Sequence, residues 1–369
     1  MVQPKYLKEE KIIFYDVVRW FFLATIIGLG SGLLVSFFIK LLDWGTAYSQ
    51  NFSKYFWIAP VFFITNIVLI KYLAPDAEGH GTEKVIEAIH KRAGRIRVAV
   101  IPIKLITTLL TLFSGGSVGK EGPSAQMGGG LSSLLADILK FNDEDRKKLV
   151  ICGISAGFAA IFGTPISGAV FGIEVLFVGV LLYDVLLPSF VAGITAFYIT
   201  HLMGVTRTDY HIDFTAGINE FFILKVALAG VAFGICAFLF IEVMNRTEAL
   251  TNKIKIHFLL KGLIGGSIII LIGSLFGTEA LGLGTSTVTG IFNGVKIVWY
   301  LFFLKIIVTS VTLNFGGSGG VVTPIFFVGA TLGALIGQLT GNDPALFAAI
   351  GLVAVLGGTT NAPIAACIM

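Results

Sequence analysis

Long apolar stretches alternate with short polar or glycine-rich stretches along almost the whole chain. Residues 20–39 carry no charge, and a stretch of this length can cross the hydrocarbon of a bilayer as a helix. Residues 306–342 and the residues after Asp343 are also uncharged. The pattern predicts an all-α, polytopic integral membrane protein. The segments expected as helices are residues 17–42, 55–72, 83–90, 98–113, 124–139, 149–162, 166–180, 185–202, 222–244, 256–276 and 295–312, with further helices ending near 341 and 355.

Short breaks containing glycine or proline interrupt this pattern, and each break in the first half has a counterpart roughly 200 residues further on. The matched breaks are residues 79–82 and 282–285, residues 115–123 and 316–324, and residues 163–166 and 361–364. Matched broken helices in two halves are typical of transporters, which bind substrate where such helices meet at mid-membrane depth. We therefore expect a first membrane repeat over residues 1–205, a polar linker over 206–220 and a second, incomplete repeat over 221–369.

Composition and charge favour a membrane protein over a soluble one. The chain is 55% hydrophobic and only 13% charged, and its mean hydropathy is +0.90. The net charge of +4 is too small to indicate a nucleic-acid partner. Basic residues gather at residues 5–11 and 90–97, which predicts that both face the cytoplasm of a multi-pass cell-membrane protein. The chain ends inside an apolar run without a helix-terminating signal, so we expect a truncated C-terminus.

The break at residues 114–123 reads Ser-Gly-Gly-Ser-Val-Gly-Lys-Glu-Gly-Pro. Glycines let successive amides face one way, and a helix tolerates Pro123 in its first turn. Exposed amides and the positive end of a helix form an anion site. Glu121 lies in this site, so its carboxylate competes with an anion when ionised and leaves when protonated. The sequence predicts a proton-linked gate, and the alternative is a carboxylate that only stabilises the helix dipole.

The counterpart break, residues 319–324, offers the same backbone geometry without a carboxylate. We expect the amides of Val321 and Val322 to face the anion from the opposite repeat. The alternative is a close helix crossing built from small residues.

Two further ionisable side chains lie at or near breaks. His80, within residues 79–82, opens a helix and would either donate a ring N–H to an anion or titrate near neutral pH. A loop histidine at the membrane interface is an equal alternative. Glu174 lies on the helix after Pro165, where a charge needs water or a partner. It is either an inner carboxylate near a cytoplasmic vestibule or a carboxylate held at a helix end.

These motifs resemble those of the CLC family of chloride channels and anion/proton antiporters. Residues 119–123, Gly-Lys-Glu-Gly-Pro, resemble the family's second signature, usually Gly-Arg/Lys-Glu-Gly-Pro. Residues 319–324, Gly-Gly-Val-Val-Thr-Pro, resemble the third, usually Gly-Gly-x-Phe-Ala-Pro. Residues 79–83, Gly-His-Gly-Thr-Glu, resemble the first, usually Gly-Ser-Gly-Ile-Pro. Order and spacing also match, and the two halves of this family are inverted-topology repeats.

The resemblance implies a homodimer with one anion pathway per subunit and with Glu121 as the external gating glutamate. The backbone of Gly122, Val321 and Val322 would coordinate the anion, and His80 stands at the family's central serine. The anion-binding residues taken from the three signatures are His80, Gly81, Gly119, Lys120, Gly122, Pro123, Gly320, Val321, Val322 and Thr323.

We expect transmembrane chloride transport through this pathway, by a channel or by an anion/proton antiporter. Val175 stands where proton-coupled members often carry an inner glutamate, which leaves the coupling open. The alternative is fluoride, because the fluoride-exporting branch also varies the central serine and can show Val-Thr-Pro at residues 322–324. That branch often has a glutamate where this chain has Val321.

Other classes of function are disfavoured by the residues. A cation transporter needs carboxylates or soft ligands in the membrane, and the breaks with their adjoining helices offer only Glu121 and Glu174 as strong candidates. An enzyme needs a nucleophile with a base, and no such pair is evident. The spacing of cysteine and histidine predicts no metal site, and we expect no cofactor.

Overall fold

The computed structural model describes residues 4–176, 182–206, 219–254 and 256–369, with side chains from residue 14 onward. In these residues the chain is helical apart from turns and connecting loops. The helices are α1 Pro4–Gln50, α2 Ala59–Leu73, α3 Gly81–Lys91, α4 Val100–Phe113, α5 Glu121–Ile138, α6 Asp143–Phe162, α7 Pro165–Glu174, α8 Tyr183–Leu202, α9 Glu220–Lys253, α10 Phe258–Phe276, α11 Thr285–Phe292, α12 Leu301–Asn314, α13 Val322–Thr340, α14 Pro344–Thr360 and α15 Pro363–Ile368, with short 3-10 turns η1 Tyr55–Ile58 and η2 Pro75–Ala77.

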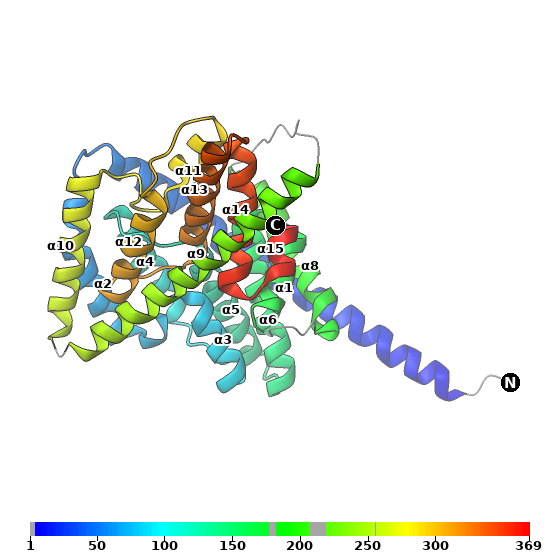
Figure 1. Cartoon of the computed structure of the whole chain (residues 1–369). Coiled ribbons are helices and arrows are strands. Elements are labelled where there is room, and N and C mark those ends of the chain that lie inside the picture. Colours follow the sequence, from blue (N-terminus) through cyan, green and yellow to red (C-terminus); the bar gives the residue numbers. More distant parts are fainter. Residues whose placement is uncertain (1–3, 177–181, 207–218, 255) are drawn as a thin grey trace.

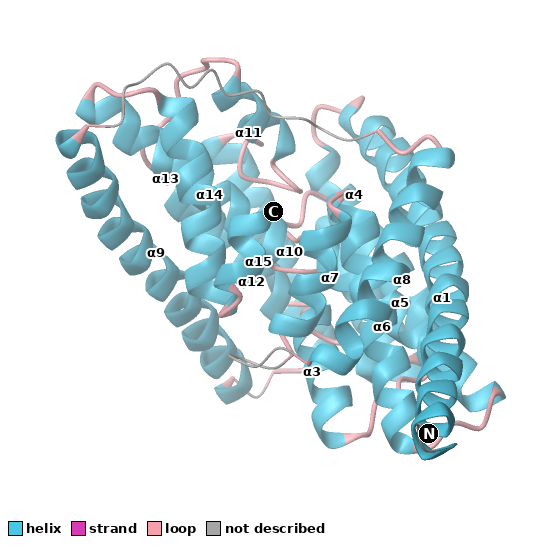
Figure 2. Cartoon of the chain, turned by 90° about the vertical axis from the view of Figure 1, so that its right-hand side faces the viewer, coloured by secondary structure: helices cyan, strands magenta, loops and turns pink. Residues whose placement is uncertain are grey.

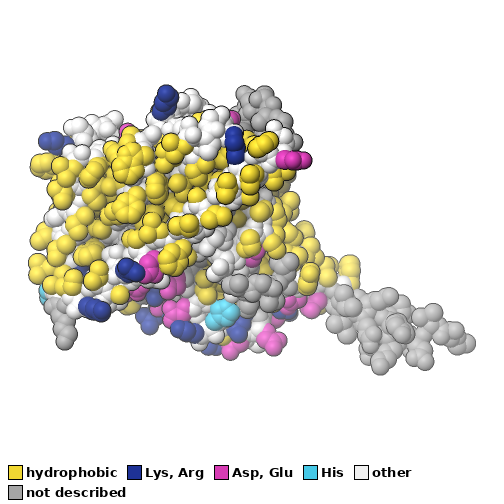
Figure 3. Space-filling model, viewed as in Figure 1, with side chains coloured by type: hydrophobic (Ala, Val, Ile, Leu, Met, Phe, Trp, Pro, Cys, Tyr) yellow, Lys and Arg dark blue, Asp and Glu magenta, His cyan; other side chains and the backbone are white. Residues whose placement is uncertain are grey.

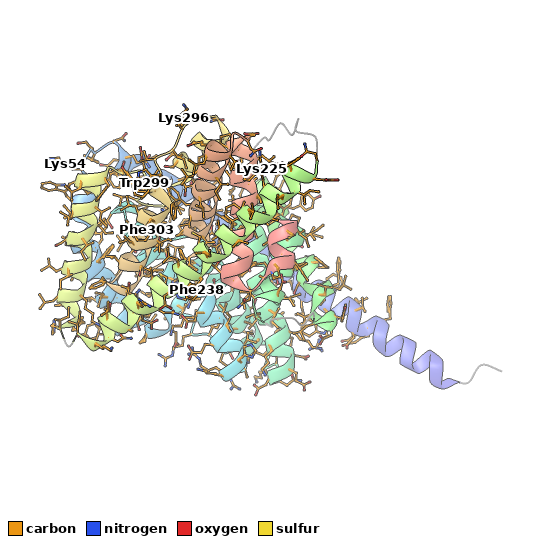
Figure 4. All side chains as sticks on the ribbon, viewed as in Figure 1. Lys54, Lys225, Phe238, Lys296, Trp299 and Phe303 are labelled. Carbon is orange, nitrogen blue, oxygen red and sulfur yellow. The ribbon has the colours of Figure 1, made fainter. Side chains whose placement is uncertain are left out.

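Six helices in the described residues are long and apolar enough to cross a membrane. They pack into one bundle, from which the first part of α1 projects, and α9 crosses the bundle obliquely (Figures 1 and 2). Hydrophobic side chains cover the middle of the face seen in Figure 3, and charged side chains gather along its lower part. Lys54, Lys225 and Lys296 mark the upper rim, above Trp299 and Phe303 (Figure 4). The expected all-helical membrane architecture is confirmed.

Several helix boundaries differ from the expected ones. The polar leader joins the first apolar stretch in one helix, α1. Helix α5 begins at Glu121, so Pro123 is its third residue. Helix α9 continues well beyond residue 244, where Arg246 bonds Glu242 at 2.6 Å one turn earlier. This i,i+4 ion pair stabilises the polar part of the helix beyond its apolar part.

Two further differences lie in regions where apolar composition alone was misleading. Helix α11 was missed, and the helix expected from residue 295 begins only at Leu301, because Gly294 turns the chain with a left-handed φ of 81°. Helix α7 ends at Glu174 rather than near residue 180, and residues 177–181 lie outside the described residues. Most of the expected linker, residues 207–218, also lies outside them, so the domain boundaries stay predictions.

Close glycine contacts join equivalent helix pairs in the two halves. A methyl group on Gly128 of α5 would overlap the carbonyl of Gly153 on α6, and one on Gly329 of α13 would overlap the carbonyl of Gly351 on α14. Small residues of this kind let membrane helices approach at backbone distance, where van der Waals packing replaces the hydrophobic effect. Because the same contact occurs in equivalent helix pairs, it supports the interpretation that the two halves are structural repeats.

The break in each half is also hydrogen-bonded to a helix of the other half. The amide of Ser117 donates to the hydroxyl of Thr312 at 3.0 Å, and the amide of Ser318 donates to the hydroxyl of Thr111 at 2.9 Å. Each break thus depends on a helix of the opposite half for a buried hydrogen bond. This exchange places the breaks side by side at the centre of the bundle.

Candidate anion-binding site

The N-termini of α3, α5 and α13 converge on one point. Gly119 and Gly320 exchange backbone hydrogen bonds, each 2.7 Å long, which join the α5 and α13 breaks. His80 pairs with Gly319 in a parallel bridge, which adds the α3 break. The sequence predicts all three breaks, and the structure shows that they meet. Three positive helix ends directed at one point favour a bound anion.

Glycine is required at this point because the backbones almost touch. A methyl group on Gly81 would overlap the carbonyl oxygen of Gly122. A methyl group on Gly122 would lie 3.3 Å from the amide nitrogens of both Gly81 and Thr82. A side chain at either glycine would therefore separate the helix ends and cover the amides that an anion needs.

Glu121 is the ionisable group at the centre of this arrangement. Its side chain is 3% exposed, and one carboxylate oxygen accepts the amide N–H of Thr323 at 3.2 Å. The other oxygen accepts the Thr323 hydroxyl in a short hydrogen bond. The carboxylate thus occupies the N-terminus of α13, where the amide and the helix end stabilise a negative charge.

Thr323 gains a role here that sequence reasoning did not give it. The signatures placed Thr323 among the anion-binding residues, without a contact to Glu121. In the structure its hydroxyl and its amide both donate to Glu121. A hydroxyl directly before a first-turn proline, opposite a glutamate of the other repeat, is the signal that identifies it.

The other predicted anion-binding residues fall into two groups. Gly81, Gly119, Gly122, Gly320 and Val322 are buried at the meeting of the breaks. The remaining predicted residues lie around them: Pro123 is buried in the first turn of α5, whereas His80, Lys120 and Val321 are half-buried. The Lys120 ammonium interacts electrostatically with Asp43 of α1.

Two fully buried lysines were missed by the sequence reasoning. Lys104 of α4 donates to the carbonyls of Ala77 and Gly79, at 3.0 and 2.6 Å. Lys305 of α12 repeats the arrangement in the second half, as described below. The two carbonyls that Lys104 binds belong to the start of the α3 break and the chain before it, so Lys104 fixes that break. A lone lysine at the same place in both apolar halves is the signal that would have identified the pair.

Glu174 lies away from the convergence point. Its side chain is 5% exposed, and its carboxylate oxygens accept the amides of Ile364 at 3.1 Å and Ala365 at 2.8 Å. The carboxylate therefore caps the N-terminus of α15. This arrangement corresponds to the alternative of a carboxylate held at a helix end, and a role in proton transport stays a prediction.

Residues 61–369 match the family model described as voltage gated chloride channel, so the chain belongs to this family, the CLC family. A chloride/fluoride channel protein of Pseudomonas syringae pv. tomato is 32% identical, over 96% of this chain and 79% of the relative. An H(+)/Cl(-) exchange transporter of Vibrio cholerae is 26% identical, over 93% of this chain and 79% of the relative.

Solved structures of CLC proteins also resemble this chain. The crystal structure of a CLC-type fluoride/proton antiporter matches with a TM-score of 0.90 and 27% identity, covering 95% of this chain and 90% of the other. That of a slow cyanobacterial Cl-/H+ antiporter matches with a TM-score of 0.81 and 22% identity, covering 95% and 88%, and shows the fold alone. The protein is therefore a multi-pass membrane protein of a family that transports anions, often with protons, and not an enzyme.

Proposed function

We propose that the protein exchanges fluoride for protons, through the site where α3, α5 and α13 meet. The observation that carries this proposal is the likeness to the fluoride/proton antiporter, at a TM-score of 0.90 and 27% identity. The relative named for both chloride and fluoride, at 32% identity, also supports it. The chloride selectivity expected from the sequence is therefore less well supported than its fluoride alternative.

The chemistry of the site fits a small anion. Fluoride concentrates its charge in a small radius, so it gains most from hydrogen-bond donors at short range. Thr323 presents an O–H and an N–H donor to one position, and Glu121 already occupies that position. Charge-assisted hydrogen bonds of this kind are stronger than neutral ones. Fluoride would take these donors when the carboxylate leaves.

Glu121 is proposed as the gate and as a proton carrier. As an anion it competes with fluoride for the donors of Thr323, and once protonated it no longer needs them. Protonation of Glu121 therefore favours binding of the anion, and ionisation of Glu121 opposes it. Coupling of this kind at one side chain is required for exchange. The homodimer implied by the family resemblance stays a prediction.

Proteoliposomes containing the full-length protein would test the function. Vesicles loaded with fluoride or chloride are diluted into anion-poor buffer, with potassium and valinomycin to carry the balancing charge. Anion and pH electrodes record both fluxes. We expect faster efflux of fluoride than of chloride, together with proton uptake. Passive loss of HF carries protons out of the vesicles, whereas the exchange carries them in, so the direction of proton movement distinguishes the two processes. Protein-free vesicles measure the rate of the passive loss.

Two results would overturn this function. Chloride efflux equal to or faster than fluoride efflux would restore the chloride reading. Fluoride efflux without proton uptake would indicate a channel.

The Glu121→Gln variant tests the gate. An amide of similar shape keeps the packing but cannot exchange a proton, so we expect fluoride flux that no longer depends on pH and no proton uptake. Glu242→Gln, on α9, is the matched control, because its carboxylate bonds only a nearby arginine of the same helix in the described contacts. Proton uptake that persists in Glu121→Gln would remove the gate role.

A further inference from the structure

We propose that His80 and Glu83 form the inner proton entry of this transporter, passing protons between the cytoplasmic solution and Glu121. The inference rests on the proton exchange proposed above and identifies a route for it. The family signatures place His80 only among the anion-binding residues, and they assign neither His80 nor Glu83 a role in proton transfer.

The two side chains are in contact at the start of α3. The Nε2 atom of His80 lies 3.4 Å from a carboxylate oxygen of Glu83, one turn further on. The side chain of Glu83 is 65% exposed and that of His80 is 32% exposed. Glu121, in contrast, is 3% exposed. Ionisable groups therefore lead from solvent towards the closed site.

Backbone contacts join this pair to the site of Glu121. His80 pairs with Gly319, and the next residue, Gly320, exchanges hydrogen bonds with Gly119. Gly119 lies two residues before Glu121, and a methyl group placed on it would overlap the Glu121 carboxylate. The backbone of His80 thus belongs to the rim of the point at which the carboxylate is held, and its imidazole lies between that rim and Glu83 in the proposed route.

The direction of this entry follows from the fold. Helix α3 lies towards the lower face of the bundle, where charged side chains gather (Figures 1 and 3). The basic segment at residues 90–97 begins in the last turn of α3, and basic loops mark the cytoplasmic side. His80 and Glu83 are therefore on the cytoplasmic side of the site.

The charges that face His80 come from three helices. Burial and the ammonium groups of Lys104 on α4 and Lys84 on α3 disfavour the imidazolium form. The carboxylates of Glu83 on α3 and Glu248 on α9 favour it. Burial is the largest of these influences, and together they lower the pKa of the His80 imidazole, so the neutral ring, which can accept a proton, is favoured near neutral pH.

The usual inner position does not offer an equivalent group. Val175 cannot carry a proton, and both oxygens of Glu174 accept amides of α15. In the proposed step, Glu83 collects a proton from the inner solution and gives it to the imidazole. The imidazole releases one proton towards Glu121 when that carboxylate leaves Thr323, so the ring is regenerated. The reverse sequence returns a proton to the cytoplasm.

The test compares Glu83→Gln with Glu87→Gln in proteoliposomes of the full-length protein. Glu87 lies one turn further along α3 and contacts Lys84 and Arg92, away from His80 in the described contacts. We expect Glu83→Gln to lower proton uptake per fluoride by roughly tenfold or more, as for loss of a positioned acid–base group. Glu87→Gln should keep the wild-type ratio, and Glu83→Asp should restore part of it.

His80→Gln provides a second reading, because it removes the titratable ring and keeps an amide of similar reach. We expect its proton uptake per fluoride to lose a dependence on internal pH that the wild type should show below about pH 6.5, because burial lowers the pKa of His80 from its ordinary value of 6.5. Retention of that dependence would overturn the relay role of the ring.

The outcomes separate this route from the proposed function. If the wild type couples protons and Glu83→Gln keeps the same ratio, the route is wrong and the exchange stands. Equal loss of fluoride and proton flux in Glu83→Gln would also overturn the route, since Glu83 would then act on transport as a whole. A wild type that moves no protons would remove the exchange and the route together.

Discussion

At the scale of single residues, the site depends on a carboxylate and a hydroxyl from opposite halves of the chain. Glu121 begins α5 and Thr323 lies in the first turn of α13. Their two hydrogen bonds hold the carboxylate at a helix end that suits any small anion. The same donors therefore serve the closed state and, as proposed, the bound substrate.

This double use of Thr323 predicts a defined loss of binding. In the Glu121→Gln background, where no carboxylate competes, Thr323→Val should weaken fluoride binding by about 10- to 100-fold, because a hydrogen bond to a charged group contributes about 1.5–3 kcal/mol. Isothermal titration of the detergent-solubilised protein measures this. Thr323→Ser keeps the hydroxyl and should bind nearly as the parent does.

Thr331→Val is the matched control for that experiment. Its hydroxyl is buried in the same helix, α13, and donates to the backbone of that helix. Equal weakening by Thr331→Val and Thr323→Val would show that the effect comes from the helix rather than from a donor to the anion.

At the scale of elements, two lysines fix the chain that precedes a broken helix. Lys305 of α12 donates to the carbonyls of Ala280 and Gly282 at 3.0 and 2.7 Å, before α11. It also lies 4.8 Å from the centre of the Phe327 ring, which favours a cation. Lys104 holds the chain before α3 in the same way.

Replacing either lysine by methionine should destabilise its break. Methionine fills similar space but leaves two buried carbonyls without a donor, and an unsatisfied buried group costs about 1–3 kcal/mol. Thermal unfolding in detergent should show similar losses for Lys104→Met and Lys305→Met. The exposed Lys296→Met is the control, and melting temperatures equal to the wild type would contradict the supporting role.

The contact of Glu174 with α15 is a second element-scale feature, and it separates two roles of this carboxylate. Glu174→Ala removes the cap and should destabilise the start of α15 by about 1 kcal/mol. Hydrogen exchange over residues 363–369 should accelerate in this variant. Glu174→Gln keeps an acceptor oxygen, so both exchange and proton uptake should stay near wild type. Loss of proton uptake in Glu174→Gln alone would instead identify an inner proton carrier.

At the scale of the whole molecule, the distribution of charge sets the orientation in the membrane. The upper rim carries Lys54, Lys225 and Lys296 (Figure 4), and the lower face is richly charged (Figure 3). Helix α3, which runs into the basic segment 90–97, lies towards that lower face (Figure 1). Basic loops are retained on the cytoplasmic side during insertion. The lower face is therefore expected inside the cell.

Cysteine labelling checks this orientation. Cys367 is exposed and must first be replaced by serine, whereas Cys152 and Cys236 are buried. In that background, a membrane-impermeant maleimide should label Lys296→Cys on intact cells. It should label Arg95→Cys only after permeabilisation. The opposite result would reverse the inner and outer sides, and with them the direction of the proposed proton entry.

Much of this molecule could be predicted from the sequence because the deciding features are local. Uncharged stretches of sufficient length indicate membrane-spanning helices, and clusters of glycine with proline indicate where a helix breaks, although single residues such as Gly128 in α5 and Pro188 in α8 lie inside helices. The breaks, their repetition and the position of Glu121 within one of them follow from these rules. The missed helix α11 and the late start of α12 show the limit, since apolar composition alone does not place a turn.

The partners of the ionisable groups were decided only by the tertiary structure. Glu121 bonds Thr323, Glu174 caps α15, and Lys104 reaches the carbonyls before α3. Each of these contacts joins segments that are distant in the chain or separated by a break. Where a buried charge goes depends on which donor or acceptor the packed helices bring within hydrogen-bond distance, and a single sequence records the residues but not that proximity.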